Sequence, residues 1–254
     1  MKFFIFCLVL PTFLFAQGTK AKDFKFKSQS GLSMIQTTGN AEVETYNLDT
    51  ETSWKKTKRI YTLKGNYTLG YAEEVNEDTG EENKVETARN WAIELKYEQI
   101  MSDWFSGFLA TSMEGDEFAG IERRNNYDIG VKQYLVQTDN TTSFAEVGYR
   151  YTNELRTEDD EDGDRRFIFN KGRVYYEISH KKSEDLSVKF WVEYLPNFTR
   201  SEDYIISYEP SVSYILSEVF SLKTAYKNRY DNEPNAEDFE KTDTQLTTSI
   251  IAKF

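Results

Sequence analysis

The end of the chain limits the possible folds more than any other stretch. Residues 242–254 alternate between two faces, as an extended strand requires. One face consists of Leu246, Thr248, Ile250, Ala252 and Phe254, and the other of Gln245, Thr247, Ser249, Ile251 and Lys253. A final strand needs a partner on each side, and in a closed barrel its second partner is the first strand. The stretch therefore predicts a closed β-barrel with one face toward hydrocarbon and the other toward water.

The start of the chain predicts export. Residues 1–16 combine one positive charge at Lys2, a short apolar run and a small residue at Ala16, which is typical of a cleaved signal peptide. Elsewhere no apolar run approaches the roughly 20 residues of a membrane helix, so any membrane-spanning segments must be strands. We therefore expect a signal peptide over residues 1–16 and one barrel domain over residues 17–254. Cys7 is the only cysteine, so the mature domain is expected to have no disulfide.

The composition fits a wall with lipid on one side and water on the other. Hydrophobic residues make up only 39%, yet Tyr and Phe together supply 35 positions, as expected where only alternate residues meet a bilayer. The formal net charge is -12, and it becomes -13 when Lys2 leaves with the signal. This acidic balance argues against nucleic acid as a partner, because little would neutralise the phosphates.

Alternation with a period of two recurs along the chain and predicts about twelve strands. They are expected over residues 23–37, 41–54, 59–72, 85–100, 104–114, 121–136, 142–153, 166–180, 186–197, 204–216, 219–230 and 242–254. The tight turn at residues 38–40 ends the first of them. We interpret the chain as one antiparallel up-and-down transmembrane barrel.

The connections between these strands support an even strand number. Every second connection is short, and the acidic loops at residues 73–84, 154–165 and 231–241 fall only on odd-numbered connections. Membrane barrels have this parity when the N-terminus is periplasmic. The alternative is a soluble periplasmic sandwich or barrel with its apolar face turned inward. The export signal, the charged second face of most strands and the loop parity favour the membrane barrel.

Several turn and strand motifs point to a known family. They are Gly31-Leu32-Ser33 followed by Thr38-Gly39-Asn40, then Asp116-Glu117-Phe118-Ala119-Gly120-Ile121 leading to Gly130, and Gly148-Tyr149-Arg150-Tyr151. These stretches resemble domain-of-unknown-function family 481, the YdiY-like proteins described as salt-induced outer-membrane proteins. The resemblance implies an outer-membrane barrel and brings no established activity or site residues. Residues 134–136 depart from the expected glycine-tyrosine ending, which leaves the register of the sixth strand open.

A catalytic site is not expected. The only histidine, His180, is predicted to face outward near the periplasmic end of its strand. Twelve-stranded outer-membrane phospholipases have a lipid-facing serine-histidine pair, so a lipid-modifying enzyme is a third alternative for the function. An imidazole at a strand end fits the membrane interface without catalysis, and we predict no enzyme and no cofactor.

One acidic loop resembles the start of a calcium-binding loop. Residues 158–164 place acids at the first, third and fifth positions and Gly163 at the sixth, but Phe169 stands where a bidentate glutamate is needed. We interpret the segment as a solvated acidic loop, with divalent bridging to lipopolysaccharide as the alternative. No metal site is predicted.

Charged residues on the inward face are the most informative set. Those predicted to line a pore are Lys64, Glu94, Lys96, Glu98, Lys132, Glu146, Arg150, Arg173, Glu177, Lys189, Glu193, Lys223 and Lys227. Inside a barrel such charges must pair or line water. Tyr175 and Trp191 are also expected to point inward and to fill part of the lumen.

These observations predict a narrow passive pore for ions or small solutes in a Gram-negative outer membrane. The alternative is a closed structural barrel whose acidic loops bind divalent ions or surface partners. Twelve strands lie between the filled eight-stranded barrels and the open barrels of sixteen or more, so the strand number allows both. The expected partners are membrane lipid, lipopolysaccharide and the barrel assembly machinery, which recognises a C-terminal strand like the one ending in Phe254.

Overall fold

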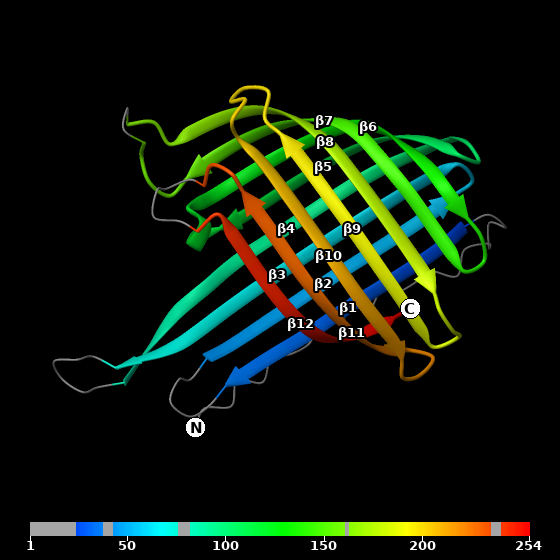
Figure 1. Cartoon of the computed structure of the whole chain (residues 1–254), viewed down its shortest axis with the longest axis horizontal. Coiled ribbons are helices and arrows are strands. Elements are labelled where there is room, and N and C mark those ends of the chain that lie inside the picture. The colour runs from blue at the N-terminus through cyan, green and yellow to red at the C-terminus, as the bar shows by residue number, and fades with distance from the viewer. Residues whose placement is uncertain (1–23, 38–42, 76–81, 161–162, 235–239) are drawn as a thin grey trace.

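The computed structural model describes residues 24–37, 43–75, 82–160, 163–234 and 240–254. Their strands form one closed antiparallel barrel, in which each strand pairs with the next and β12 returns to β1 (Figure 1). The elements are β1 (Phe24–Thr37), β2 (Val43–Lys56), β3 (Arg59–Val75), β4 (Glu82–Ser102), β5 (Phe105–Asp116), η1 (Glu117–Ala119), β6 (Ile121–Gln137), β7 (Thr141–Arg156), β8 (Arg166–Lys181), β9 (Leu186–Pro196), β10 (Tyr204–Ile215), β11 (Phe220–Asp231) and β12 (Thr242–Lys253). The predicted twelve-stranded barrel is therefore confirmed. The signal peptide and the turn at residues 38–40 lie outside the described residues.

Two of the predicted acidic loops are shorter than expected. β3 extends to Val75, which lies opposite Glu82 at the start of β4, so this hairpin protrudes beyond its neighbours (Figure 1). β7 continues to Arg156, which places Glu154 in a strand rather than in a loop. The acidic residues of these stretches led to the prediction of loops. Charged residues can nevertheless continue a strand where their side chains contact water or an opposite charge. Glu154 meets two arginines inside the barrel.

The outer surface is apolar, as a lipid-facing wall must be. Outward-facing aliphatic side chains are widely exposed, among them Leu95, Ile129 and Val147. Outward-facing aromatic side chains lie near both ends of the barrel: the rings of Trp54 and Tyr61 stack with centroids 5.6 Å apart beside residues 57–58, and those of Tyr194 and Tyr204 lie 6.0 Å apart beside residues 197–203. This arrangement is that of a transmembrane barrel with an aromatic girdle.

The connections follow the predicted parity. Connections such as 57–58 and 216–219 are short turns, whereas 157–165 and 232–241 are long. The short turns lie at the same end as the C-terminus, which is at the right in Figure 1. We call this the short-turn end and the opposite one the long-loop end. No helix of the described residues is long and apolar enough to cross a membrane.

Local structure explains why glycine occupies two positions of the family-like motifs. Gly120 adopts a left-handed conformation with φ 69° after η1, and the Asp116 carboxylate caps that helix by accepting from Ala119 N–H at 3.1 Å. Gly130 lies beneath Phe108, where an added Cβ would stand 2.6 Å from the ring. The register of β6 also shifts between Tyr134 and Val136, at the point where the sequence departed from the family pattern.

Candidate functional site: the barrel lumen

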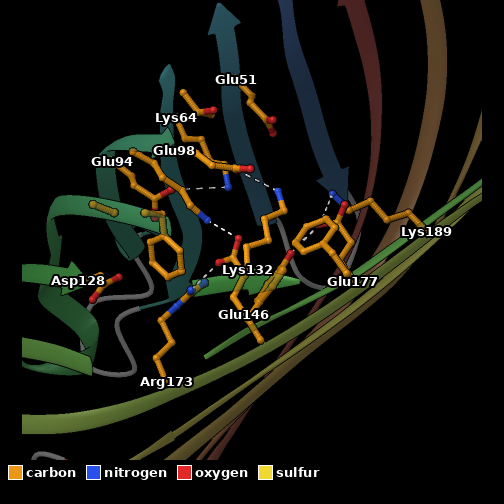
Figure 2. Close-up of a pocket in the computed structure, with 16 residues that line it drawn as sticks. Glu51, Lys64, Glu94, Glu98, Asp128, Lys132, Glu146, Arg173, Glu177 and Lys189 are labelled. Atoms are coloured by element: carbon orange, nitrogen blue, oxygen red, sulfur yellow. Dashed lines mark hydrogen bonds and ion pairs between the residues drawn. The ribbon is translucent and has the colours of Figure 1, made fainter. Parts of the chain in front are cut away.

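The lumen contains the charges that alternation placed on the inward face. Nine of the thirteen predicted pore-lining residues border one cavity of about 230 Å³ (Figure 2). They are Lys64, Glu94, Lys96, Glu98, Lys132, Glu146, Arg173, Glu177 and Lys189. The other four, Arg150, Glu193, Lys223 and Lys227, are not among the residues that border this cavity.

A chain of ion pairs crosses one side of the lumen. Glu146 on β7 holds both Lys96 on β4, at 2.5 Å, and Arg173 on β8, at 2.7 Å. Arg173 also contacts Glu193 on β9 at 2.6 Å. In Figure 2, a dashed line joins Glu146 to Arg173. Because Lys96 and Glu146 come from strands that are not neighbours, this pair ties separate parts of the wall together.

The network continues toward the long-loop end through Arg150. Its guanidinium binds both carboxylate oxygens of Asp128, at 2.7 and 2.8 Å, and lies 3.9 Å from Glu193. Two parallel hydrogen bonds fix this geometry more tightly than a single contact would. Asp128 was not among the predicted lining residues, although alternation on β6 already placed it on the face of Lys132.

These charges are withdrawn from water and satisfied by one another. Glu146 is 1% exposed and Glu98 is 5% exposed. Lys132 Nζ contacts Glu98 at 3.1 Å, and the hydroxyl of Tyr134 donates to the same carboxylate at 3.3 Å. Buried charges are costly unless paired and hydrogen-bonded. The mixed signs predicted from the sequence are therefore used mainly for internal neutralisation on this side.

Aromatic rings fill the space between the ion pairs. Lys96 Nζ lies 4.2 Å from the centre of the Phe108 ring, and Lys132 Nζ lies 4.0 Å from that of Phe144. Tyr175 and Trp191 stack with ring centres 6.0 Å apart. Such contacts favour cations over ring faces. We call the inward-facing side chains of β5 to β9, together with Lys96 and Glu98 of β4, the packed wall.

A second charged cluster near the long-loop end was not found from the sequence. Arg124 binds Glu154 at 2.6 Å and Glu114 at 3.1 Å, and Arg156 binds Glu154 at 3.0 Å. The first arginine lies on β6, and its alternation with Asp128 would have placed it inward. Glu154 was missed because its acidic surroundings predicted a loop.

The remaining strands present a different surface to the lumen. Asp49, Lys64, Asn66 and Lys227 lie in mid-strand on the inward face and are nevertheless exposed. The side chain of Lys64 is 49% accessible, and its distance to Glu94 is 3.7 Å. We call the inward-facing side chains of β10 to β12 and β1 to β3 the open wall. Inside a closed barrel, exposed inward side chains mean that solvent reaches the lumen beside them.

Uncharged hydrogen bonds link the strands of the open wall. Asn47 donates to Ser33 Oγ at 3.1 Å and accepts from Thr68 at 2.9 Å and from Gln245 at 3.0 Å. Hydroxyl and amide groups of this kind hold strands together while remaining good partners for water.

The other candidates from the sequence form no assembled site. His180 is exposed, and its Nδ1 lies 2.8 Å from the Thr141 hydroxyl. The calcium-like loop includes residues 161–162, which lie outside the described residues. Among the residues that the structure describes, no three His, Cys, Asp or Glu side chains form a cluster able to hold a metal ion.

The fold and its lumen define a transmembrane β-barrel with a partly filled, charged interior. The chain belongs to the family described as protein of unknown function, DUF481, whose model matches residues 30–254. The resemblance suggested by the motifs is thus confirmed. No relative was found among curated proteins.

Several solved barrels are similar to this chain. The NanC porin has 10% identity and a TM-score of 0.45, covering 90% of this chain and 98% of its own. The KdgM porin has 12% identity and a TM-score of 0.43, covering 89% and 98%. The translocator domain of the autotransporter NalP from Neisseria meningitidis has 8% identity and a TM-score of 0.45, covering 95% and 90%.

Proposed function

We propose that the protein is a narrow, passive, non-enzymatic pore for ions and small hydrophilic solutes in a Gram-negative outer membrane. The observation that carries this proposal is the exposure of Asp49, Lys64, Asn66 and Lys227 on the inward face of a closed barrel. A lumen filled throughout by side chains would leave mid-strand inward residues buried, as on the packed wall. The permeation path therefore runs along the open wall and is displaced from the barrel axis.

The charges of both walls that border the lumen cavity indicate weak selectivity. Six carboxylates and five cations border the cavity, so neither sign dominates it. Lys64 and Lys189 are the cations with the most accessible side chains there, at 49% and 40%. Accessible charges act on passing ions more than buried, neutralised ones do. The pore should pass small ions of both signs and exclude bulky solutes.

The proposed location follows from the outer surface and the last strand. The apolar exterior is suited to lipid, and β12 presents Leu246, Ile250 and Phe254 outward. We assign to this strand the recognition by the barrel assembly machinery that the sequence suggested, with lipopolysaccharide as the partner of the long-loop end.

Single-channel recording tests the function directly. The refolded mature chain, residues 17–254, is inserted into a planar bilayer and its conductance and ion selectivity are measured. Discrete, stable steps are expected. A demonstrably folded barrel that stays silent would contradict the pore and favour the closed structural barrel.

Neutralising single lumen charges locates the path. Lys189→Gln should shift the selectivity toward cations, because the side chain is 40% accessible although it contacts Glu177 at 2.9 Å. Glu193→Gln should change the conductance less, because Glu193 is 19% accessible and binds Arg173. Both residues lie on β9, so equal and large effects of both changes would contradict a path that follows the accessible lumen side chains.

A further inference from the structure

Cationic side chains gather at the short-turn end of the open wall. Four inward-facing lysines lie there, namely Lys25 and Lys27 on β1, Lys55 on β2 and Lys253 on β12. Three of them are exposed, and Lys55 is half-buried. We call these four side chains the lysine mouth. They lie where the solvent-accessible side of the lumen opens at this end of the barrel.

Two of these lysines face each other directly. Lys25 and Lys55 are partners in the register of β1 and β2, so their Cβ atoms are about 5 Å apart. Lys27 lies two residues further along the same face of β1, diagonally opposite Lys55. Like charges directly opposite each other destabilise a sheet. A bound anion would remove this cost, because it would attract both ammonium groups.

No acidic side chain neutralises the lysine mouth. Residues 24–41, 52–72 and 244–254 contain neither Asp nor Glu. Deeper in the lumen, inward lysines have carboxylate partners, as Lys132 has in Glu98 at 3.1 Å. The four lysines of the mouth take part in no ion pair among the described residues. In a chain with a net charge of -12, this cluster is a local reversal of charge.

The charge of the open wall reverses again further into the lumen. On β2, the next inward charges beyond Lys55 are Glu51 and Asp49, and neither forms an ion pair among the described residues. Lys64 lies between Glu51 and Glu94 in one cross-strand row, so this row has a net negative charge. A multivalent anion that enters from the short-turn end therefore meets lysines first and repulsive carboxylates next.

We propose that the lysine mouth binds soluble multivalent anions of the phosphate type, which enter from the short-turn end and obstruct the permeation path. Lysine ammonium groups bind phosphate oxygens as point charges, and rings of lysine form anion sites in pores. The carboxylates beyond the mouth keep such an anion from passing through. The binding site depends on the lysines alone, whereas the obstruction rests on the proposed pore.

The same rim provides a matched control on its other face. Lys56 and Arg59 are register partners across the turn between β2 and β3, and both lie on the outward face, as Trp54 and Tyr61 do. This second pair of like charges faces the lipid head groups instead of the lumen. Removing it changes the net charge by the same amount as removing Lys25 and Lys55.

Titration calorimetry with pyrophosphate tests the site without requiring conduction. The refolded chain, residues 17–254, is used in phosphocholine micelles. Lys25→Gln/Lys55→Gln should weaken binding about tenfold and Lys27→Gln about threefold, because exposed ion pairs make modest individual contributions. Lys56→Gln/Arg59→Gln should leave the affinity nearly unchanged. Absence of binding to the wild-type barrel, or equal weakening by the two double variants, would overturn the site.

Spin-labelled phosphatidylglycerol distinguishes a lipid head group from a soluble anion as the ligand. In bilayers, the fraction of this lipid that the barrel immobilises should fall for Lys56→Gln/Arg59→Gln and stay unchanged for Lys25→Gln/Lys55→Gln. A fall for the inward variant, with pyrophosphate binding unaffected, would identify a lipid head group as the ligand and overturn the soluble-anion site.

One-sided block of single channels tests the obstruction. Pyrophosphate should lower the conductance of each inserted channel from one side only, and Lys25→Gln/Lys55→Gln should abolish this block. Equal block from both sides would contradict an obstruction at the lysine mouth. A silent barrel that still binds pyrophosphate would remove the proposed pore and leave the site, whereas a conducting barrel that binds none would remove the site alone.

Discussion

The two walls of the lumen contain the same types of charged residue in different environments. On the packed wall, charges such as Glu146 and Arg173 are buried and neutralise each other. On the open wall, Lys64 and Asp49 remain exposed although they too face inward. The number of inward charges therefore does not decide how much of the lumen stays accessible to solvent. What decides it is whether those charges find partners across the lumen.

Charges on the packed wall find oppositely charged partners because their strands carry long side chains at similar positions along the barrel axis. Lys96 reaches Glu146 from a strand that is not adjacent, and Phe108 fills the space beneath it. The open wall has shorter polar groups instead, such as Ser33 and Thr68, which bind within their own wall. Side chains consequently fill the lumen along the packed wall, whereas solvent reaches the inward side chains along the open wall.

The largest expected effect is on the packed wall. Glu146→Ala leaves Lys96 and Arg173 buried without the carboxylate that they share, which should lower the free energy of unfolding by about 3 to 5 kcal/mol. Denaturant unfolding of the refolded barrel measures this. Glu51→Gln is the control on the open wall, where less than about 1 kcal/mol is expected for a carboxylate with no ion pair among the described residues. Equal losses would erase the distinction between the walls.

A smaller loss of stability is expected at Gly130, where the absence of a side chain leaves room for the Phe108 ring. Gly130→Ala places a Cβ 2.6 Å from both the Phe108 ring and the Val147 carbonyl oxygen, so the ring must shift, at about 1 to 3 kcal/mol. Gly65→Ala is the matched control, because its nearest neighbour, Thr50 Cγ2, is 3.4 Å away. The same unfolding measurement applies, and a stable Gly130→Ala protein would show that the ring is not held in place.

On the open wall the expected effect is on conduction rather than stability. Lys64→Glu reverses an accessible charge beside the path and should raise the cation-to-anion permeability ratio severalfold. Reversal potentials under a salt gradient measure it. Lys182→Glu makes the same charge change in the turn between β8 and β9, and should leave the ratio nearly unchanged. A stronger response at Lys182 would place the selective charges outside the lumen.

The smallest effect is expected at the only histidine. His180→Ala removes an exposed imidazole that contacts the Thr141 hydroxyl, and it should change neither conductance nor stability measurably. Phospholipid hydrolysis should stay at the background level for both the wild-type barrel and the variant. Hydrolysis that depends on His180 would instead support the lipid-modifying enzyme.

The sequence predicted the fold well because the fold depends on local patterns. The alternation around Leu95 and Glu98, the parity of the connections and the two-faced last strand each express one strand or one turn. Most inward charges followed from the same alternation. Asp128 followed from it as well, but it was overlooked because it lies among arginines and asparagines rather than in a clear apolar pattern.

The division into two walls was not predictable in this way. It depends on which side chains meet across the lumen, and the contact between Lys96 and Glu146 arises only when strands far apart in sequence are set at a particular stagger. The short ladder between β1 and β12 also depends on that stagger, since no sequence signal at Leu32 or Ile250 marks where it ends.

Two inward asparagines give the most direct test of a path along the open wall. Asn66 on the open wall is exposed, whereas Asn126 on the packed wall is 3% exposed and binds Ser112 and Thr152. Single variants Asn66→Cys and Asn126→Cys of residues 17–254 are treated with a cationic methanethiosulfonate during single-channel recording. A path along the open wall predicts a stepwise fall in conductance for Asn66→Cys and no reaction for Asn126→Cys. Equal modification at both positions, or modification at Asn126→Cys alone, would contradict a path along the open wall.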